Sequence, residues 1–248
     1  MSQNVMIPEC EQSAQDLAFM DIATQMAEEA LAASEIPVGC ILVQDNKVIA
    51  KGRNRTNEGR NATLHAEFDA LRHLLPERTH AITPTLTRPF TPQHRPGSVE
   101  VERAANRSEG NEREGEEQDS KRRVWETPLQ GVTLYVTVEP CVMCASAMRQ
   151  VGIGRVVYGC ANDRFGGCGG VQSIHSDSRL LYSPPYVAEG GYRRESAIML
   201  LRRFYVTENI NAPKPKSKVN RVLKFEIADI PPALSPKQEN ESVILDED

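Results

Sequence analysis

Apolar residues recur along the first third of the chain with two different periods, which predict alternating helices and strands. Residues 11–34 place apolar side chains three and four positions apart and are rich in alanine, as expected for a helix. Two strands are expected next, at 38–44 and 47–50, separated by an Asp-Asn pair that favours a tight turn. A second helix is expected over 65–75.

The same alternation returns in the second half of the chain. Residues 132–138 form a β-branched run that is typical of a buried central strand, and a helix is expected after Pro140. We expect another strand over 151–158, a loop over the glycine-rich residues 165–170, and a last helix over 192–206. Because strands and helices alternate, the pattern predicts a layered α/β domain.

Two stretches break this pattern. Residues 98–123 hold eight acids and six bases with almost no apolar side chain, so a disordered insertion is predicted from about 77 to 128. Residues 209–248 are first basic and then acidic, and we expect them to form an unstructured tail. The predicted organisation is therefore an N-terminal extension over 1–10, one domain over 11–208 that contains the insertion, and the C-terminal tail.

Composition narrows the cellular setting. The 248 residues are enough for one good-sized domain with a real core. The first residues show no basic start followed by an apolar run, and no stretch of about 18 apolar residues exists, so neither a signal peptide nor a membrane span is expected. The expected location is the nucleus and cytoplasm, where thiols stay reduced and a CxxC pair is more often metal-binding or redox-active than a disulfide.

Two short motifs carry the candidate chemistry: His65-Ala66-Glu67, and Cys141-Val142-Met143-Cys144 after Pro140. One imidazole and two thiols are zinc ligands, and a set of three leaves a fourth position for water, as in catalytic zinc sites. Glu67 is spare and could move the protons of that water. Taken singly, these residues could pack in the core or form a redox pair, but their combination favours a catalytic zinc site.

The pattern HxE followed by PCxxC is the signature of zinc-dependent nucleobase deaminases, and the chain resembles the cytidine deaminase-like superfamily. Within it, four stretches are similar to bacterial tRNA adenosine deaminases of the TadA type: 37–39, 52–55, 65–67 and 134–144. Residues 158–169 and 211–214 resemble the catalytic subunit of the eukaryotic wobble-adenosine deaminase. The resemblance covers roughly 15–75 and 129–218, which leaves out the insertion and the last thirty residues.

This resemblance implies a three-layer α/β/α fold with a mixed central sheet, and hydrolytic deamination of adenosine to inosine at wobble position 34 of tRNA by a zinc-activated hydroxide. Carried over, His65, Cys141 and Cys144 would hold Zn²⁺, Glu67 would transfer protons, and Asn54 would bind the flipped nucleotide. The family's catalytic subunit works as a heterodimer with a non-catalytic paralogous deaminase subunit. Because Glu67 is present, this chain should be the active member.

The charge map adds a candidate RNA surface. Net charge is −5, yet residues 190–224 carry nine Lys and Arg against two Glu. Such a cluster could neutralise tRNA phosphates, although a solvated helix face followed by a charged tail would look the same. The candidate contacts are Arg193, Arg194, Arg202, Arg203, Lys214, Lys216 and Lys218, with Arg221 and Lys224 close by.

Three alternatives stay open. The same zinc chemistry serves deaminases of free guanine, cytosine or cytidine, and a non-catalytic RNA-binding subunit could use zinc for stability. Asn54 could simply cap a turn. Two departures from the family pattern are Leu64, where a small residue usually precedes the HAE triplet, and the insertion, whose closure costs only about one or two kcal/mol of extra entropy.

Overall fold

The computed structural model of the chain describes residues 5–74, 129–180, 183–208, 218 and 220–228. The predicted insertion over 77–128 lies outside these residues, as do Lys214 and Lys216. Within the described part, the strands form one sheet in the order β2-β1-β3-β4-β5. Their bounds are Gly39–Gln44 for β1, Lys47–Arg53 for β2, Thr133–Val138 for β3, Arg155–Cys160 for β4 and Val187–Glu189 for β5.

The sheet is mixed, as the resemblance implied. β1 pairs antiparallel with β2 and with β3, whereas β3, β4 and β5 are parallel. Asp45 and Asn46 both take positive φ, 49° and 60°, which matches the twist of a tight hairpin between β1 and β2. Since β1 runs against both of its neighbours, β2 runs in the same direction as β3, β4 and β5. The carboxyl ends of these four strands therefore lie along one edge of the sheet, where open α/β sheets bind their ligands.

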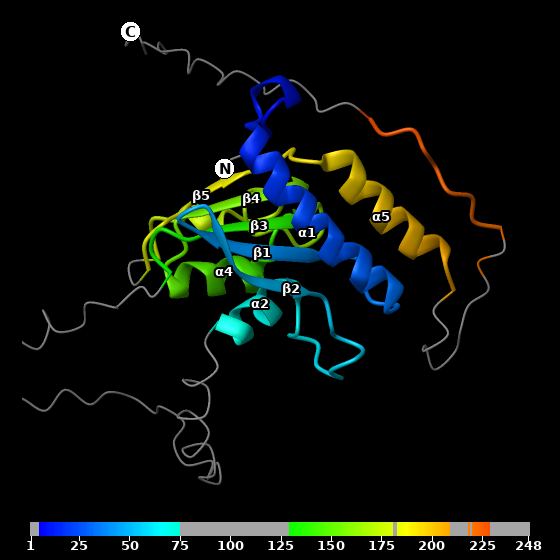
Figure 1. The fold of residues 1–248 in the computed structure, drawn as a ribbon, viewed down its shortest axis with the longest axis horizontal. Helices are drawn as coiled ribbons and strands as arrows, with labels where there is room; N and C mark the ends of the chain where they lie inside the picture. The colour runs from blue at the N-terminus through cyan, green and yellow to red at the C-terminus, as the bar shows by residue number, and fades with distance from the viewer. Residues whose placement is uncertain (1–4, 75–128, 181–182, 209–217, 219, 229–248) are drawn as a thin grey trace, which may run out of the picture.

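Helices cover both faces of the sheet (Figure 1). Helix α1 (Ala14–Ala32) and helix α5 (Arg194–Val206) lie on one face, and α2 (Ala66–Leu74) and α4 (Val142–Val151) lie on the other. Two short 3-10 helices complete the fold: η1 (Glu9–Glu11) precedes α1, and η3 (Ile174–Ser176) lies between β4 and β5. This arrangement confirms the predicted three-layer α/β/α fold.

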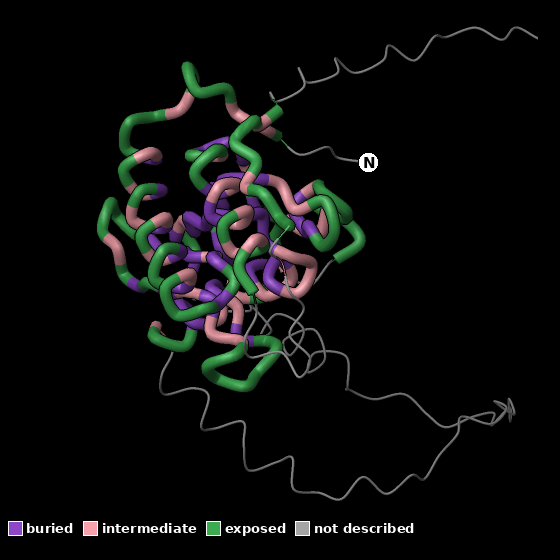
Figure 2. Tube along the Cα trace, turned by 90° about the vertical axis from the view of Figure 1, so that its right-hand side faces the viewer, coloured by how far each residue is buried: buried purple, intermediate pink, exposed green. Residues whose placement is uncertain are grey.

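Strand β1 shows why three layers are needed. Cys40 and Leu42 pack against α2 and α4, while Ile41 and Val43 pack against α1. Successive strand side chains point to opposite faces, so the apolar run over residues 40–43 needs cover on both sides. Figure 2 shows the result, with the buried segments in the middle of the molecule and exposed tube on the outer turns and loops.

One expected strand needs correction, and another strand was missed. The strand predicted over 151–158 begins later, because α4 continues to Val151 and ends at Gly152, whose φ of 75° suits glycine. β4 consequently starts at Arg155. Strand β5 was not predicted; three residues are too few to show a period of two.

The segments at the two chain ends attach to the domain. Ile7 donates a backbone hydrogen bond to Gly190 just beyond β5, at 2.8 Å. Arg202 on α5 donates to the carbonyls of Lys224 and Glu226, so the described tail residues run beside α5 without forming a helix or strand (Figure 1). In the described residues, no helix is both long and apolar enough to cross a membrane.

Candidate metal centre

The two sequence motifs meet at the carboxyl edge of the sheet. His65 lies directly before α2, Cys141 is the N-cap residue of α4, and Cys144 lies in its first turn. The Nδ1 atom of His65 lies 3.6 Å from the Cys141 Sγ and 3.5 Å from the Cys144 Sγ. All three ligand atoms lie within 4.8 Å of one another.

These separations fit zinc. A tetrahedral ion with bonds of about 2.0 Å to nitrogen and 2.3 Å to sulfur holds those two ligand atoms about 3.5 Å apart. One imidazole and two thiols also match the ligand chemistry that zinc prefers, and three protein ligands leave one position open. The residues predicted as ligands therefore form a site that is suited to a catalytic zinc ion.

The backbone around the cysteines is fixed by the glycine-rich loop that follows β4. Cys141 forms an isolated β-bridge with Gly166, and the Val142 N–H donates to the carbonyl of Phe165 at 2.9 Å. The Cys141 carbonyl then accepts from the Ala145 N–H, which begins α4. Both thiols consequently lie at a helix N-terminus, where the helix dipole favours negative charge.

The three ligands share protons unequally. Hydrogen bonds from the Cys144 thiol and from His65 outweigh burial and lower the pKa of Cys141 to about 4. The hydrogen bond to Cys141 raises the pKa of Cys144, and burial raises it further. The hydrogen bond between His65 and Cys141 raises the pKa of the His65 imidazole. Zinc binding would displace the protons that the ligand atoms carry, because zinc binds thiolates and neutral imidazole.

Glu67 is the spare acid that the sequence predicted. It is the second residue of α2, only 3% exposed, and it is not one of the clustered ligand residues. Burial raises the pKa of Glu67, and the Cys144 thiol partly offsets this rise. A carboxyl group can accept a proton in one step of a reaction and donate it in the next, and Glu67 is placed beside the ligands for both transfers.

Asn54 follows β2 at the same edge of the sheet and is 4% exposed. The next residue, Arg55, donates its N–H to the carbonyl of Leu64 at 3.1 Å, which ties this segment to the residue before His65. The Asn54 side-chain nitrogen donates to Glu35 at 3.1 Å and to Thr56 at 3.2 Å. Asn54 thus lies beside the metal centre, and its contact with a nucleotide stays a prediction.

The basic side chains that are candidate RNA contacts differ in exposure and in the contacts that they make within the protein. Arg193 forms an ion pair with Asp21 at 2.7 Å. Arg202 donates to the carbonyl of Lys224 in the tail, and Lys218 donates to the carbonyl of Thr207, directly after α5. Arg203 is exposed and Arg194 is half-buried.

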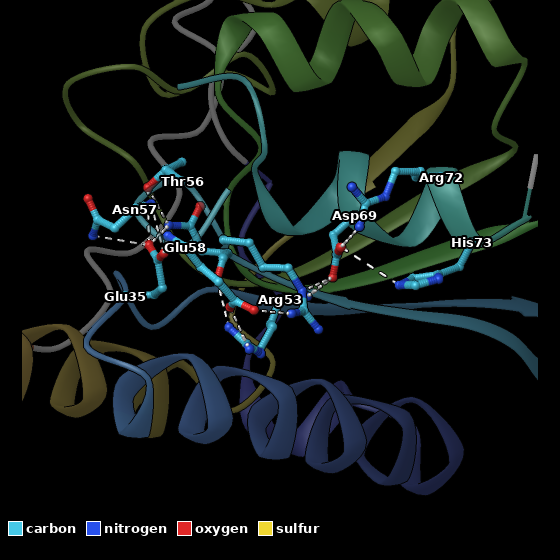
Figure 3. A network of polar contacts seen from close by, with 10 residues as sticks. Glu35, Arg53, Thr56, Asn57, Glu58, Asp69, Arg72 and His73 are labelled. Atoms are coloured by element: carbon cyan, nitrogen blue, oxygen red, sulfur yellow. Dashed lines mark hydrogen bonds and ion pairs between the residues drawn. The ribbon is translucent and has the colours of Figure 1, made fainter. Parts of the chain in front are cut away.

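Two buried acids that the sequence reasoning passed over also support this edge. Glu139, just before Pro140, accepts from the backbone N–H groups of Asn162, Cys168 and Gly170 at 2.8–2.9 Å. It thereby holds the glycine-rich loop that pairs with Cys141. Glu35 holds the segment after Asn54 in the same way, because it accepts from the backbone N–H groups of Asn57 and Glu58 (Figure 3). The only sequence signal for these two residues is an acid close to a buried strand. The groups that donate to them are too distant in sequence to be predicted from it.

Comparisons with known proteins agree with this site. The family model for the cytidine and deoxycytidylate deaminase zinc-binding region matches residues 13–160. The chain is 39% identical over 198 residues to the tRNA-specific adenosine deaminase 2 of Xenopus tropicalis, which covers 80% of this chain and 93% of the relative. It is 37% identical to the tRNA-specific adenosine deaminase subunit tad2 of Schizosaccharomyces pombe, over 84% of this chain and 42% of that one.

A solved structure is similar as well. It comes from a study of A-to-I editing by tRNA:A34 deaminases at the wobble position of transfer RNA. It matches with a TM-score of 0.51 and 26% identity, over 74% of this chain and 99% of the other. With its zinc-type ligand cluster in the matched region, the chain belongs to the tRNA-specific adenosine deaminases of the zinc-dependent cytidine and deoxycytidylate deaminase family.

Proposed function

We propose that this chain is the catalytic subunit of an enzyme that converts adenosine at wobble position 34 of tRNA to inosine by hydrolysis. One observation carries the proposal: a complete His-Cys-Cys cluster lies beside the buried acid Glu67, in a chain 39% identical to a tRNA-specific adenosine deaminase 2. A subunit that used zinc only for stability would not need a buried acid that lies beside the ligands without being one of them.

The chain's residues divide the chemistry between them. His65, Cys141 and Cys144 would hold zinc, which when bound lets water ionise near neutral pH. Glu67 takes a proton from the attacking water and places it on N1 of the purine while oxygen bonds to C6. Glu67 then passes the second water proton to the exocyclic nitrogen, which leaves as ammonia. The products, inosine and ammonia, account for every atom of adenosine and water.

The target base must leave its stack to reach a buried acid, and an anticodon loop offers single-stranded bases that are extruded at low cost. Asn54 would bind this nucleotide at the edge of the sheet. Its neighbour Arg55 is bonded to Leu64, directly before His65, which supports a place for the base between Asn54 and the ligands.

The basic residues of α5 and the tail would bind tRNA phosphates. Residues without an acidic partner within the protein should contribute more to this binding than residues that are already paired. Arg203 is exposed, whereas Arg193 is paired with Asp21. We expect Arg203→Ala to weaken tRNA binding about three- to tenfold and to reduce the slope of log affinity against log salt by about one. Arg193→Ala is the matched control and should change both less. Equal losses in the two variants would contradict this ranking.

The partner would be a non-catalytic paralogous deaminase subunit. Two observations support this: the resemblance to the eukaryotic wobble enzyme, and the relative from Schizosaccharomyces pombe, which is itself named a subunit. The six cysteines are all free, which agrees with a reducing compartment, so the enzyme would work in the nucleus and cytoplasm. Fluorescent tagging of the full chain tests this location, and signal confined to a secretory organelle would contradict it.

The function is tested with the chain co-expressed with its candidate paralogue. The complex is incubated with a tRNA transcript that carries adenosine at position 34, and inosine is detected by sequencing as an A-to-G change. We expect inosine at position 34 alone. Deamination of free guanine, cytosine or cytidine without action on tRNA would replace the proposal with a free-base or nucleoside deaminase. Bound zinc without any deamination would favour the RNA-binding subunit.

A further inference from the structure

We propose that Glu35 is a positioning residue for Asn54: it orients the Asn54 amide so that the carbonyl oxygen, not the amino group, meets a bound nucleotide. This inference rests on the proposed function of Asn54 as a nucleotide-binding residue. Glu35 lies outside both zinc motifs in the sequence, and the orientation that it imposes decides which kind of group Asn54 recognises.

The end of α1 fixes the place of Glu35. Ser34 takes a φ of 59°, and its N–H donates to the carbonyl of Leu31 at 3.0 Å. The Glu35 N–H donates back to Ala30 at 2.9 Å. These two bonds close the helix in the manner of a Schellman motif, which leaves little freedom for the residue that follows the left-handed position. The Glu35 side chain is fully buried.

Five donors converge on the Glu35 carboxylate from the segment after β2 (Figure 3). Its Oε1 accepts from the backbone N–H groups of Asn57 and Glu58, both at 2.8 Å. Its Oε2 accepts from Asn54 Nδ2 and Thr56 Oγ1, both at 3.1 Å, and from Asn57 Nδ2 at 3.3 Å. A carboxylate has about four lone-pair positions, so these donors occupy its accepting capacity.

This environment permits only one orientation of the Asn54 amide. A carboxylate that already binds two backbone N–H groups can only accept, so turning the amide oxygen toward Glu35 would place acceptor against acceptor in a buried site. Thr56 adds to the constraint: its hydroxyl donates to Glu35 and accepts from Asn54 Nδ2 at 3.2 Å. Both hydrogens of the Asn54 amino group are therefore used inside the protein.

The consequence is chemical. With Nδ2 committed to Glu35 and Thr56, Asn54 can offer a nucleotide only the acceptor Oδ1. The nucleotide group at this position must then be a donor, such as a ribose hydroxyl or an exocyclic amino group. Loss of the carboxylate would let the amide turn, and the site would no longer present a single acceptor.

A double-mutant cycle tests whether Glu35 acts through Asn54. Glu35→Gln keeps the shape but places a donor NH₂ group among the donors of Asn54 and Thr56. We expect it to lower kcat/KM about tenfold in the wild-type background, the effect of one misplaced hydrogen bond. In the Asn54→Ala background, the same change should cost less than about twofold, because its target is gone.

Asp16→Asn is the matched control. Asp16 is a buried acid like Glu35 and lies at the other end of α1, but it accepts from Tyr135 and Arg155 and not from Asn54. Its kcat/KM should match the parent in both backgrounds, and zinc content should be equal in all variants. If Glu35→Gln costs the same factor with and without Asn54, Glu35 only shapes the loop and the proposal is wrong.

The double-mutant cycle can decide the role of Glu35 even if the proposed tRNA substrate is wrong. It is run on whichever substrate the wild-type complex deaminates, so a complex that acts on a free nucleoside would refute the tRNA proposal while still deciding the role of Glu35. Affinity for an anticodon stem-loop, measured by fluorescence anisotropy on the same four proteins, gives a second cycle that does not depend on turnover. Additive losses in affinity would likewise overturn the role of Glu35.

Discussion

Glu67→Gln is expected to lower kcat for deamination by about 10³-fold while zinc stays bound. The amide has nearly the shape of the carboxyl group, but it can neither take a proton from water nor return one to the purine. General acid–base catalysis is worth about 10²–10⁴-fold in rate, and Glu67 would serve in two successive transfers. The ligand cluster does not include Glu67, so zinc content should not change.

Single-turnover kinetics on tRNA, with zinc measured by elemental analysis of the same samples, checks this expectation. Asp69→Asn is the control, because Asp69 is equally buried on the same helix but bonds to Arg53 and Arg55 rather than to the cluster. It should reduce kcat only slightly. Activity that survives Glu67→Gln would refute the proton-transfer role, and loss of zinc in that variant would assign Glu67 to the ligands.

Cys144→Ser is expected to remove zinc and to lower the melting temperature by about 10 °C. Cys144 is fully buried, and the cluster brings its thiol against His65 and Cys141. Zinc that binds only the folded chain adds about 4 kcal/mol when present at a thousand times its dissociation constant. In a domain of this size each kcal/mol corresponds to roughly 2–4 °C.

Elemental analysis and thermal unfolding with and without a chelator test the prediction for Cys144→Ser. Chelator should lower the melting temperature of the wild type toward that of Cys144→Ser and leave the variant unchanged. Cys160→Ser is the control: this thiol is also buried, in the cluster with Val138 and Ala197, so it should lose stability but keep zinc. A Cys144→Ser protein that retains one zinc per chain would contradict the assignment of this ligand.

The zinc ligands were predictable because each motif is local. His65 and Glu67 are two residues apart, Cys141 and Cys144 are three apart, and each pair lies at a helix start that the flanking pattern indicated. Most elements were predictable for the same reason, since their periods are read within a few residues. The strand expected at 151 failed because the residues up to Val151 continue α4, and only the left-handed turn at Gly152 ends the helix.

The sequence by itself determined the ligand types, the spare acid and the alternation of helices and strands. The tertiary structure decided which distant residues support them. Glu35 and Glu139 hold the two sides of the site by accepting from backbone N–H groups about twenty to thirty residues away. Every residue type except proline can supply a backbone N–H donor, so no sequence pattern marks these donors. Only the parallel course of β2, β3 and β4 brings these segments to one edge of the sheet, where two buried carboxylates satisfy them.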